Sequence, residues 1–296
     1  MSVPTHEPVM VAETLALLAP ARGGLFVDCT VGLGGHSRAL LEAGASRILG
    51  LDRDPDALTR AAEALAEFGD RVELVHADYR DLPRVLHERG LTGIDGALAD
   101  LGVSSMQLEA EGRGFSFRRD DPLDMRMDRS HGETAAEWLA EIDEESLADV
   151  IFQYGEERYS RRIARAIVSS RKLTPIRTTA ALAYVVRGAI PRRGYQRIDP
   201  ATRTFQAVRI WTNRELERLD RFLTETAQRL LGGARLAVIT FHSLEDRIVK
   251  HAFRALAQAE SALRVVTKRP TNPSDDDVAR NPRARSAKLR AIERCA

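Results

Sequence analysis

A glycine-rich stretch that follows an acidic residue is the feature of this 296-residue sequence best suited to chemistry. A β-prone run, 25–29, contains Asp28 and is followed by a set of glycines: Gly32, Gly34 and Gly35. Glycines at these positions give a turn with little side-chain bulk, so a ligand can lie close to the backbone. We expect Ser37 to cap the helix that follows, whose first N–H groups favour a negative group. Strand, turn and helix predict the first unit of a nucleotide-binding α/β sheet.

Two further acidic residues stand where apolar runs end. Asp52 follows the strand-like run 46–51, about twenty residues after the glycines, where an acid holds the ribose hydroxyls of a cofactor. The dinucleotide fingerprint requires a glycine at position 37, where this chain has serine. The compact loop therefore favours S-adenosylmethionine over a nicotinamide cofactor. Tyr79 follows a third strand-like run and could stack on adenine, although spacing alone leaves ordinary packing equally open.

Asp100 ends a fourth strand-like run that begins at residue 94. Ligands of open parallel sheets lie at the carboxyl ends of the strands, so Asp100 should face the reactive end of the cofactor. Amino-methyltransferases that act on nucleobases carry an Asn or Asp here, which accepts hydrogen bonds from the exocyclic amine. In those enzymes Pro-Pro-aromatic usually follows, whereas this chain continues with Leu101, Gly102 and Val103.

Composition and charge indicate a globular protein with a polyanionic partner. Two cysteines cannot form a disulfide framework or a zinc site, which indicates a reducing, cytoplasmic location. No signal peptide or membrane span is expected. Residues 1–154 hold 14 Lys and Arg against 29 Asp and Glu, whereas residues 155–221 hold 16 against 6. This asymmetry favours nucleic acid as the partner of the second half, with solvated basic helix faces as the alternative.

The sheet pattern is interrupted after its fourth strand. Helical spacing dominates from Thr134, where Glu137 completes a capping box, and one long helix is expected over 202–231, closed by Gly232. Strand patterns return at 235–241, 263–267 and 287–292. The sequence therefore predicts an α/β fold, a Rossmann-like methyltransferase sheet interrupted by an all-α inserted domain. We expect residues 1–131 with 209–296 to form the discontinuous cofactor domain, and 132–208 the helical insertion, which would recognise RNA.

Three smaller features complete the candidates. The run 120–128 holds four aspartates, but it lacks EF-hand spacing and methyl transfer needs no metal, so no metal is expected. His6 could contact substrate or cofactor, or be structural. A loop around Gly194 is expected to contact RNA through three arginines: Arg192, Arg193 and Arg197.

Ten ordered motifs make the chain resemble, from end to end, the bacterial small-subunit ribosomal RNA cytosine-N4 methyltransferases. They lie at residues 6–9, 28–37, 52–55, 100–105, 113–117, 121–128, 154–158, 201–210, 241–247 and 281–286. The resemblance implies methylation of the exocyclic amine of a cytidine in 16S ribosomal RNA of the small subunit, near the peptidyl-tRNA site. S-adenosylmethionine is the implied cofactor, and no membrane partner is expected.

The resemblance also implies the site residues. Asp100 would be catalytic, and the cofactor would be held by a larger set: Gly34, Gly35, His36, Asp52, Tyr79, Asp100 and Gln107. Tyr79 replaces a phenylalanine common in the family, and Met106 replaces a usual proline next to Gln107. Two alternatives remain, a DNA amino-methyltransferase and a non-catalytic RNA-binding protein with a vestigial cofactor fold. A homodimer is left open.

Overall fold

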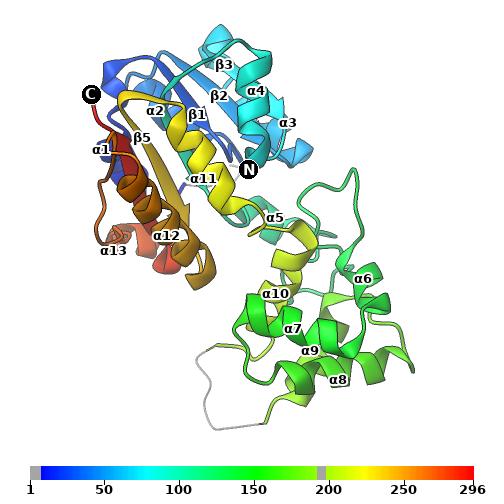
Figure 1. The fold of residues 1–296 in the computed structure, drawn as a ribbon. Helices are drawn as coiled ribbons and strands as arrows, with labels where there is room; N and C mark the ends of the chain where they lie inside the picture. Colours follow the sequence, from blue (N-terminus) through cyan, green and yellow to red (C-terminus); the bar gives the residue numbers. More distant parts are fainter. Residues whose placement is uncertain (1–7, 192–197) are drawn as a thin grey trace. The chain divides into compact units, whose positions relative to one another are not determined.

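A seven-stranded sheet in the order β3-β2-β1-β4-β5-β7-β6 organises the computed structural model, which describes residues 8–191 and 198–296 (Figure 1). β1 to β5 run parallel, and β7 is antiparallel to both of its neighbours, β5 and β6. The strands are β1 (Leu25–Asp28), β2 (Arg47–Asp52), β3 (Val72–His76), β4 (Ile94–Asp100), β5 (Leu230–Thr240), β6 (Leu263–Val265) and β7 (Lys288–Arg294). The predicted α/β sheet is confirmed.

Helices cover both faces of this sheet, because successive side chains of a strand point to opposite faces. Val27 of β1 lies in one buried cluster with Phe222 and Phe253, whereas its neighbour Phe26 lies in another with Leu40. The helices associated with the sheet are α1 (Val11–Leu18), α2 (Gly35–Glu42), α3 (Pro55–Ala64), α4 (Leu82–Glu88), α11 (Leu219–Gln228), α12 (Ser243–Ala259) and α13 (Asp275–Arg280). Burial on both faces explains why β4 is almost continuously apolar.

The chain forms two compact units, one of residues up to 102 together with 216–296, and one of residues 103–215. The expected limits of the helical insertion, 132 and 208, therefore differ from the observed ones. The segment 109–131, expected to belong to the cofactor domain, packs Leu123, Met125 and Met127 into the helical core. The buried side chain of Asn213 also binds this segment, accepting from Met127 N at 2.7 Å and donating to Met125 O at 2.7 Å.

The second unit is a helical domain around its own apolar core. Its helices are α5 (Ser105–Glu109), α6 (Ala135–Glu141), α7 (Glu144–Gly155), α8 (Ser160–Arg171), α9 (Thr179–Ala189) and α10 (Thr202–Asn213). Leu147, Ile151 and Ile163 are among its fully buried side chains. The predicted capping box between Thr134 and Glu137 is confirmed at the start of α6.

The single helix expected over 202–231 is wrong. α10 ends at Asn213 and α11 begins at Leu219, since Arg214 (φ 50°) and Arg218 (φ 57°) adopt left-handed backbone conformations between them. The apolar face of α10 packs into the core of the helical unit, and that of α11 into the core of the sheet unit. Both helices have the same spacing of apolar residues, so this spacing does not reveal the break between them. Gly232, expected to close the helix, lies within β5.

The aspartate-rich run, the residues outside the description and the character of the helices remain to be described. The buried Asp124 pairs with Arg126 at 2.7 Å and Asp128 accepts from Ser130 N at 2.8 Å, so these carboxylates serve local structure. His6 and the arginines at 192, 193 and 197 lie outside the described residues. Within the described ranges, none of the helices has the length and apolar character needed to span a membrane.

Candidate cofactor-binding and catalytic site

The carboxyl ends of β1, β2 and β4 meet at one edge of the sheet, where the direction of strand succession reverses. From β1 the chain proceeds outward through β2 to β3, whereas β4 lies on the other side of β1 and leads to β5. A topological switch point of this kind is where open α/β sheets bind ligands. Six of the seven predicted site residues belong to this unit, and the seventh, Gln107, belongs to the helical unit.

The turn after β1 is built from glycines in left-handed conformations. Gly32 has φ 54° and Gly34 has φ 84°, which side chains with a Cβ rarely adopt. Gly34 is the N-cap residue of α2, and Gly35 is its first residue. A Cβ on Gly35 would lie only 2.9 Å from Cγ of Pro8, so the segment before α1 packs directly on this turn.

The prediction that Ser37 caps the helix is wrong, because α2 begins two residues earlier. Ser37 is fully buried and donates from Oγ to Oδ2 of Asp28 at 2.7 Å. Oδ1 of Asp28 accepts from Thr30 N at 3.2 Å. Burial raises the pKa of Asp28, although nearby His36 and these two hydrogen bonds act in the opposite direction. Asp28 therefore organises the glycine turn from beneath.

A link between the turn and β4 was missed by sequence reasoning. Thr30 accepts a hydrogen bond at Oγ1 from the backbone N of Asp100 at 2.7 Å. Asp28, Thr30 and Asp100 thus tie the end of β1 to the end of β4. The sequence signal was Thr30, two residues after Asp28, and it could not be interpreted without the strand pairing.

Asp52 lies at the end of β2, with both carboxylate oxygens engaged by backbone N–H groups. Oδ2 accepts from Gly32 N at 2.8 Å, and Oδ1 accepts from Asp54 N at 2.9 Å. Burial raises the pKa of Asp52 to about 6 despite these bonds. Each oxygen of a carboxylate has a second acceptor position. Asp52 is therefore rigidly held and still able to accept two hydroxyl groups.

His36 and Asp100 face each other across the turn. Nε2 of His36 lies 3.7 Å from Oδ2 of Asp100, and the Asp100 side chain is 24% exposed. His36 Nε2 and Asp100 Oδ1 are both buried, and within the described residues neither has a hydrogen-bond partner. Buried polar atoms are rarely left unsatisfied, so we expect a ligand to supply the missing partners of this pair.

Tyr79 lies in the short turn after β3 and is buried. Its ring packs against Phe222 at a centroid distance of 4.7 Å and an angle of 58°, and burial raises its pKa. Asp78 fixes the turn by accepting from Arg80 Nε at 2.7 Å. The packing on Phe222 supports the structural interpretation of Tyr79, and adenine stacking stays a prediction.

Gln107 serves the helix that contains it. In the helical unit, Ser104 Oγ accepts from Gln107 N at 3.1 Å, and Gln107 Oε1 accepts from Ser104 N at 3.1 Å, which completes a capping box at α5. The expected cofactor contact of Gln107 stays a prediction.

The residues of the sheet unit fit S-adenosylmethionine. The glycine turn admits close approach of a ligand, Asp52 offers acceptors suited to ribose hydroxyls, and His36 and Asp100 carry unsatisfied polar atoms. This site, on a doubly wound sheet with β7 reversed between β5 and β6, defines a Rossmann-like methyltransferase that uses S-adenosylmethionine.

The chain belongs to the MraW methylase family, whose sequence model matches residues 4–295. Three relatives carry the name ribosomal RNA small subunit methyltransferase H. The protein of Nitrobacter winogradskyi is 48% identical over 98% of this chain and 90% of its own length. The protein of Anaeromyxobacter sp. strain K is 49% identical over 98% of this chain and 97% of its own length. That of Nitrosococcus oceani is 49% identical over 99% of this chain and 98% of its own length.

Proposed function

We propose that this protein transfers a methyl group from S-adenosylmethionine to the exocyclic N4 amine of a cytidine in 16S ribosomal RNA of the small ribosomal subunit. We place the target near the peptidyl-tRNA site, as the resemblance of the whole chain implies. The observation that carries the proposal is Asp100, a carboxylate at the switch point whose Oδ1 lacks a hydrogen-bond partner within the described residues. An acceptor of this kind suits an N–H donor.

Asp52 and the glycine turn would hold the cofactor. The two bonds from Gly32 and Asp54 fix the orientation of the Asp52 carboxylate, so its remaining acceptor positions point outward toward ribose hydroxyls. When bound, the cofactor supplies an electrophilic methyl group on a sulfonium. The Gly34 turn and the N-terminus of α2 favour a negative group such as a carboxylate. His36, Tyr79 and Gln107 complete the set of proposed contacts.

Asp100 would position the nucleophile. The N4 lone pair of cytosine is delocalised into the ring, so the amine is a poor nucleophile and must be held in line with the methyl group. Positioning of this kind can supply several kcal/mol of the barrier. Asp100 would accept one N–H of the amine while the new N–C bond forms, and the amine then loses one proton. Its backbone is held by the bond from Asp100 N to Thr30 Oγ1, so the carboxylate is presented from a fixed strand end.

The target base must leave its stack to reach this site. Unstacking costs least in single-stranded RNA, where bases can be splayed out. We propose that the helical unit helps to hold such RNA, as its α8 carries Arg161 and Arg162, exposed and without ion pairs among the described residues. Single-stranded RNA fits the excess of basic residues over 155–221.

The test uses small ribosomal subunits from a strain that lacks this protein. The parent protein with methyl-labelled cofactor should label the 16S RNA, and mass mapping should place the methyl on a cytidine N4. Asp100→Ala should reduce the label, whereas Asp70→Asn, a change at an exposed acid of the same unit, should not. Equal labelling of DNA would support the DNA amino-methyltransferase. Cofactor binding without any transfer to subunits would support the vestigial alternative.

A further inference from the structure

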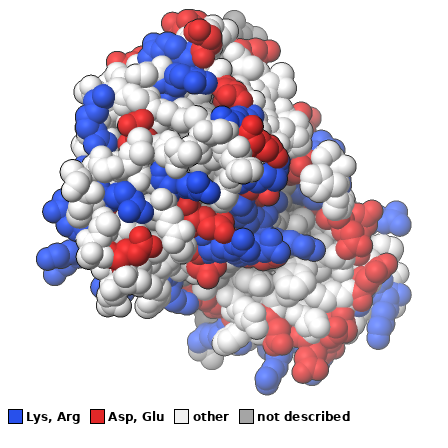
Figure 2. Space-filling view, turned by 45° about the horizontal axis from the view of Figure 1, so that its top comes forward, with Lys and Arg blue, Asp and Glu red and all other residues white. Residues whose placement is uncertain are grey.

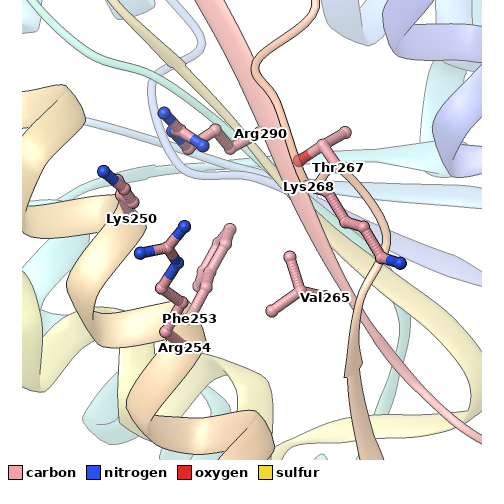
Figure 3. A pocket seen from close by; sticks show the side chains of 7 residues that line it. All are labelled: Lys250, Phe253, Arg254, Val265, Thr267, Lys268 and Arg290. Atoms are coloured by element: carbon pink, nitrogen blue, oxygen red, sulfur yellow. The ribbon is translucent and has the colours of Figure 1, made fainter.

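A basic cavity lies between α12 and the two strands at the end of the sheet, β6 and β7. Its volume is about 290 Å³. Lys250, Phe253 and Arg254 of α12 line one side, and the other lining residues come from the β6 region and β7: Val265, Thr267, Lys268 and Arg290 (Figure 3). Figure 3 shows the nitrogens of Lys250, Arg254 and Arg290 on the same side of the Phe253 ring, whereas Nζ of Lys268 points away from them. Among the described residues, those that line this cavity include no acidic side chain.

Two of these cations are available to a ligand. Lys250 and Arg254 form no ion pair or hydrogen bond through their side chains within the described part of the chain. The third, Arg290, is buried and bound to Asp246, with Nε at 2.6 Å and Nη2 at 3.3 Å. Asp246 also accepts from Lys288 at 3.3 Å. The Asp246 carboxylate is therefore neutralised by two cations, and the cavity keeps an excess of positive charge.

Many cations elsewhere on the surface are paired with acidic side chains. On the face drawn in Figure 2, Lys and Arg side chains are mixed with Asp and Glu side chains. Most arginines of the sheet unit follow the same pattern, as with Arg38 beside Glu42 and Arg84 beside Glu88. Unpaired cations around an apolar floor of Phe253 and Val265 create a stronger attraction for an anion, since the apolar groups reduce solvent screening.

The cavity lies in the same unit as the proposed reaction site, on the face of the sheet that α12 covers. Asp100 on β4 is in register with Ile239 on β5, which is in register with Leu289 on β7, so Arg290 lies one residue from this row and its side chain is on the opposite face of the sheet. Two strand spacings correspond to about 10 Å. Along α12, Lys250 and Arg254 stand about 12 and 18 Å from the N-cap residue His242, at a rise of about 1.5 Å per residue.

We propose that this cavity binds a backbone phosphate of the RNA strand that carries the target nucleotide. The inference rests on the proposed function, which makes single-stranded RNA the substrate. A phosphodiester carries a single negative charge and exposed acceptor oxygens, which match the donors of Lys250 and Arg254. The cavity volume is at the low end for small-molecule sites, so it suits one phosphate with part of its sugar. Bound there, a phosphate some nucleotides away from the target would anchor the strand while the target base turns toward the cofactor.

The test measures how the affinity for methyl-deficient small subunits depends on KCl concentration at constant magnesium. Each phosphate contact to single-stranded RNA adds about 0.7 to the slope of log affinity against log salt. Arg254→Gln should lower the slope by up to about 0.7, and the double variant Lys250→Gln/Arg254→Gln, which loses this one phosphate contact completely, by about 0.7. The matched control is Arg60→Gln, an exposed arginine of α3 without ion pairs among the described residues, which should leave the slope unchanged. All variants should keep the parent's cofactor affinity and unfolding temperature, since neither cavity side chain supports the fold.

Two outcomes would overturn the inference. One is a double variant with the parent's affinity and salt slope. The other is a result in which calorimetry shows that the parent binds inorganic phosphate and the double variant does not, although both bind subunits with equal affinity. The cavity would then be a site for a free anion. Transfer of tritiated methyl groups to the subunits, measured in the same experiment, separates the phosphate site from the proposed function. A parent that methylates subunits while the slopes are equal refutes only the phosphate site, and a parent that methylates nothing refutes the proposed function.

Discussion

The raised pKa of Asp52 makes cofactor affinity depend on pH. Ribose hydroxyls donate hydrogen bonds to an ionised carboxylate, so the cofactor binds the ionised form of Asp52. Burial raises the pKa of this carboxyl to about 6 in the free protein. Affinity should therefore be highest above pH 6 and fall as the pH drops through that value, with a proton released on binding below it.

The size of the effect follows from the fraction of ionised Asp52. One pH unit below the pKa, about one molecule in eleven is ionised, against about ten in eleven at pH 7, so the Kd at pH 5 should be about tenfold higher than at neutral pH. Asp52→Asn removes the charge, and its amide would also oppose the N–H of Gly32 or Asp54. The loss of one charged hydrogen-bonding group predicts a weakening of roughly 1.5–3 kcal/mol at pH 7.5.

Calorimetric titration of the parent with S-adenosylmethionine between pH 5 and 7.5 measures this dependence, with circular dichroism to confirm the fold at each pH. The matched control is Asp70→Asn, which should follow the parent's curve. A Kd that stays constant from pH 7.5 to 5 would refute the reasoning. So would an Asp52→Asn protein that keeps the parent's dependence, because the titrating group would then be another one.

Three further predictions concern catalysis and stability. Asp100→Ala should lower the single-turnover rate at saturating cofactor more than it lowers subunit affinity, and equal rates would leave the loop carbonyls after Asp100 as the better acceptors. Ser37→Ala leaves Asp28 Oδ2 without its hydrogen-bond partner and should cost about 1–3 kcal/mol of unfolding free energy, measured in urea; an unchanged midpoint would contradict the role given to Ser37. Asn213→Ala removes two bonds to the backbone of 125–127 and should speed amide exchange there, with exchange in β4 unchanged. Equal rates of amide exchange at residues 125–127 in the parent and in this variant would show that Asn213 does not hold the segment.

The parallel strands could be predicted from sequence because each is a short buried run that ends in a polar residue. Asp28, Asp52 and Asp100 all stand at strand ends, as the alternation of apolar runs and turn residues indicated. Which acid is held by which neighbour could not be predicted. The bond between Thr30 and Asp100 joins residues 70 positions apart, and only the pairing of β1 with β4 brings them together.

The helical unit shows a different limit of prediction from sequence. Its extent was underestimated since the segment 109–131 looks charged and loop-like, although Leu123, Met125 and Met127 are buried. These apolar residues alternate with aspartates and an arginine, a spacing typical of a strand rather than of a loop packed on helices, so their burial depends on contacts such as those of Asn213 that no local pattern encodes. The break between α10 and α11 was hidden for the opposite reason, because a regular pattern continued through residues of left-handed conformation.

The order of strands in the sheet has a consequence for synthesis. β7 is the last strand along the chain, yet it lies inside the sheet between β5 and β6. On a translating ribosome, β5 can join β4 while its other side, along Arg235–Thr240, stays an open edge until residues 288–294 emerge. Such an edge can pair with a neighbouring nascent chain. A premature stop before residue 288 would therefore do more than shorten a tail, because it would leave the released protein with an aggregation-prone interior strand exposed.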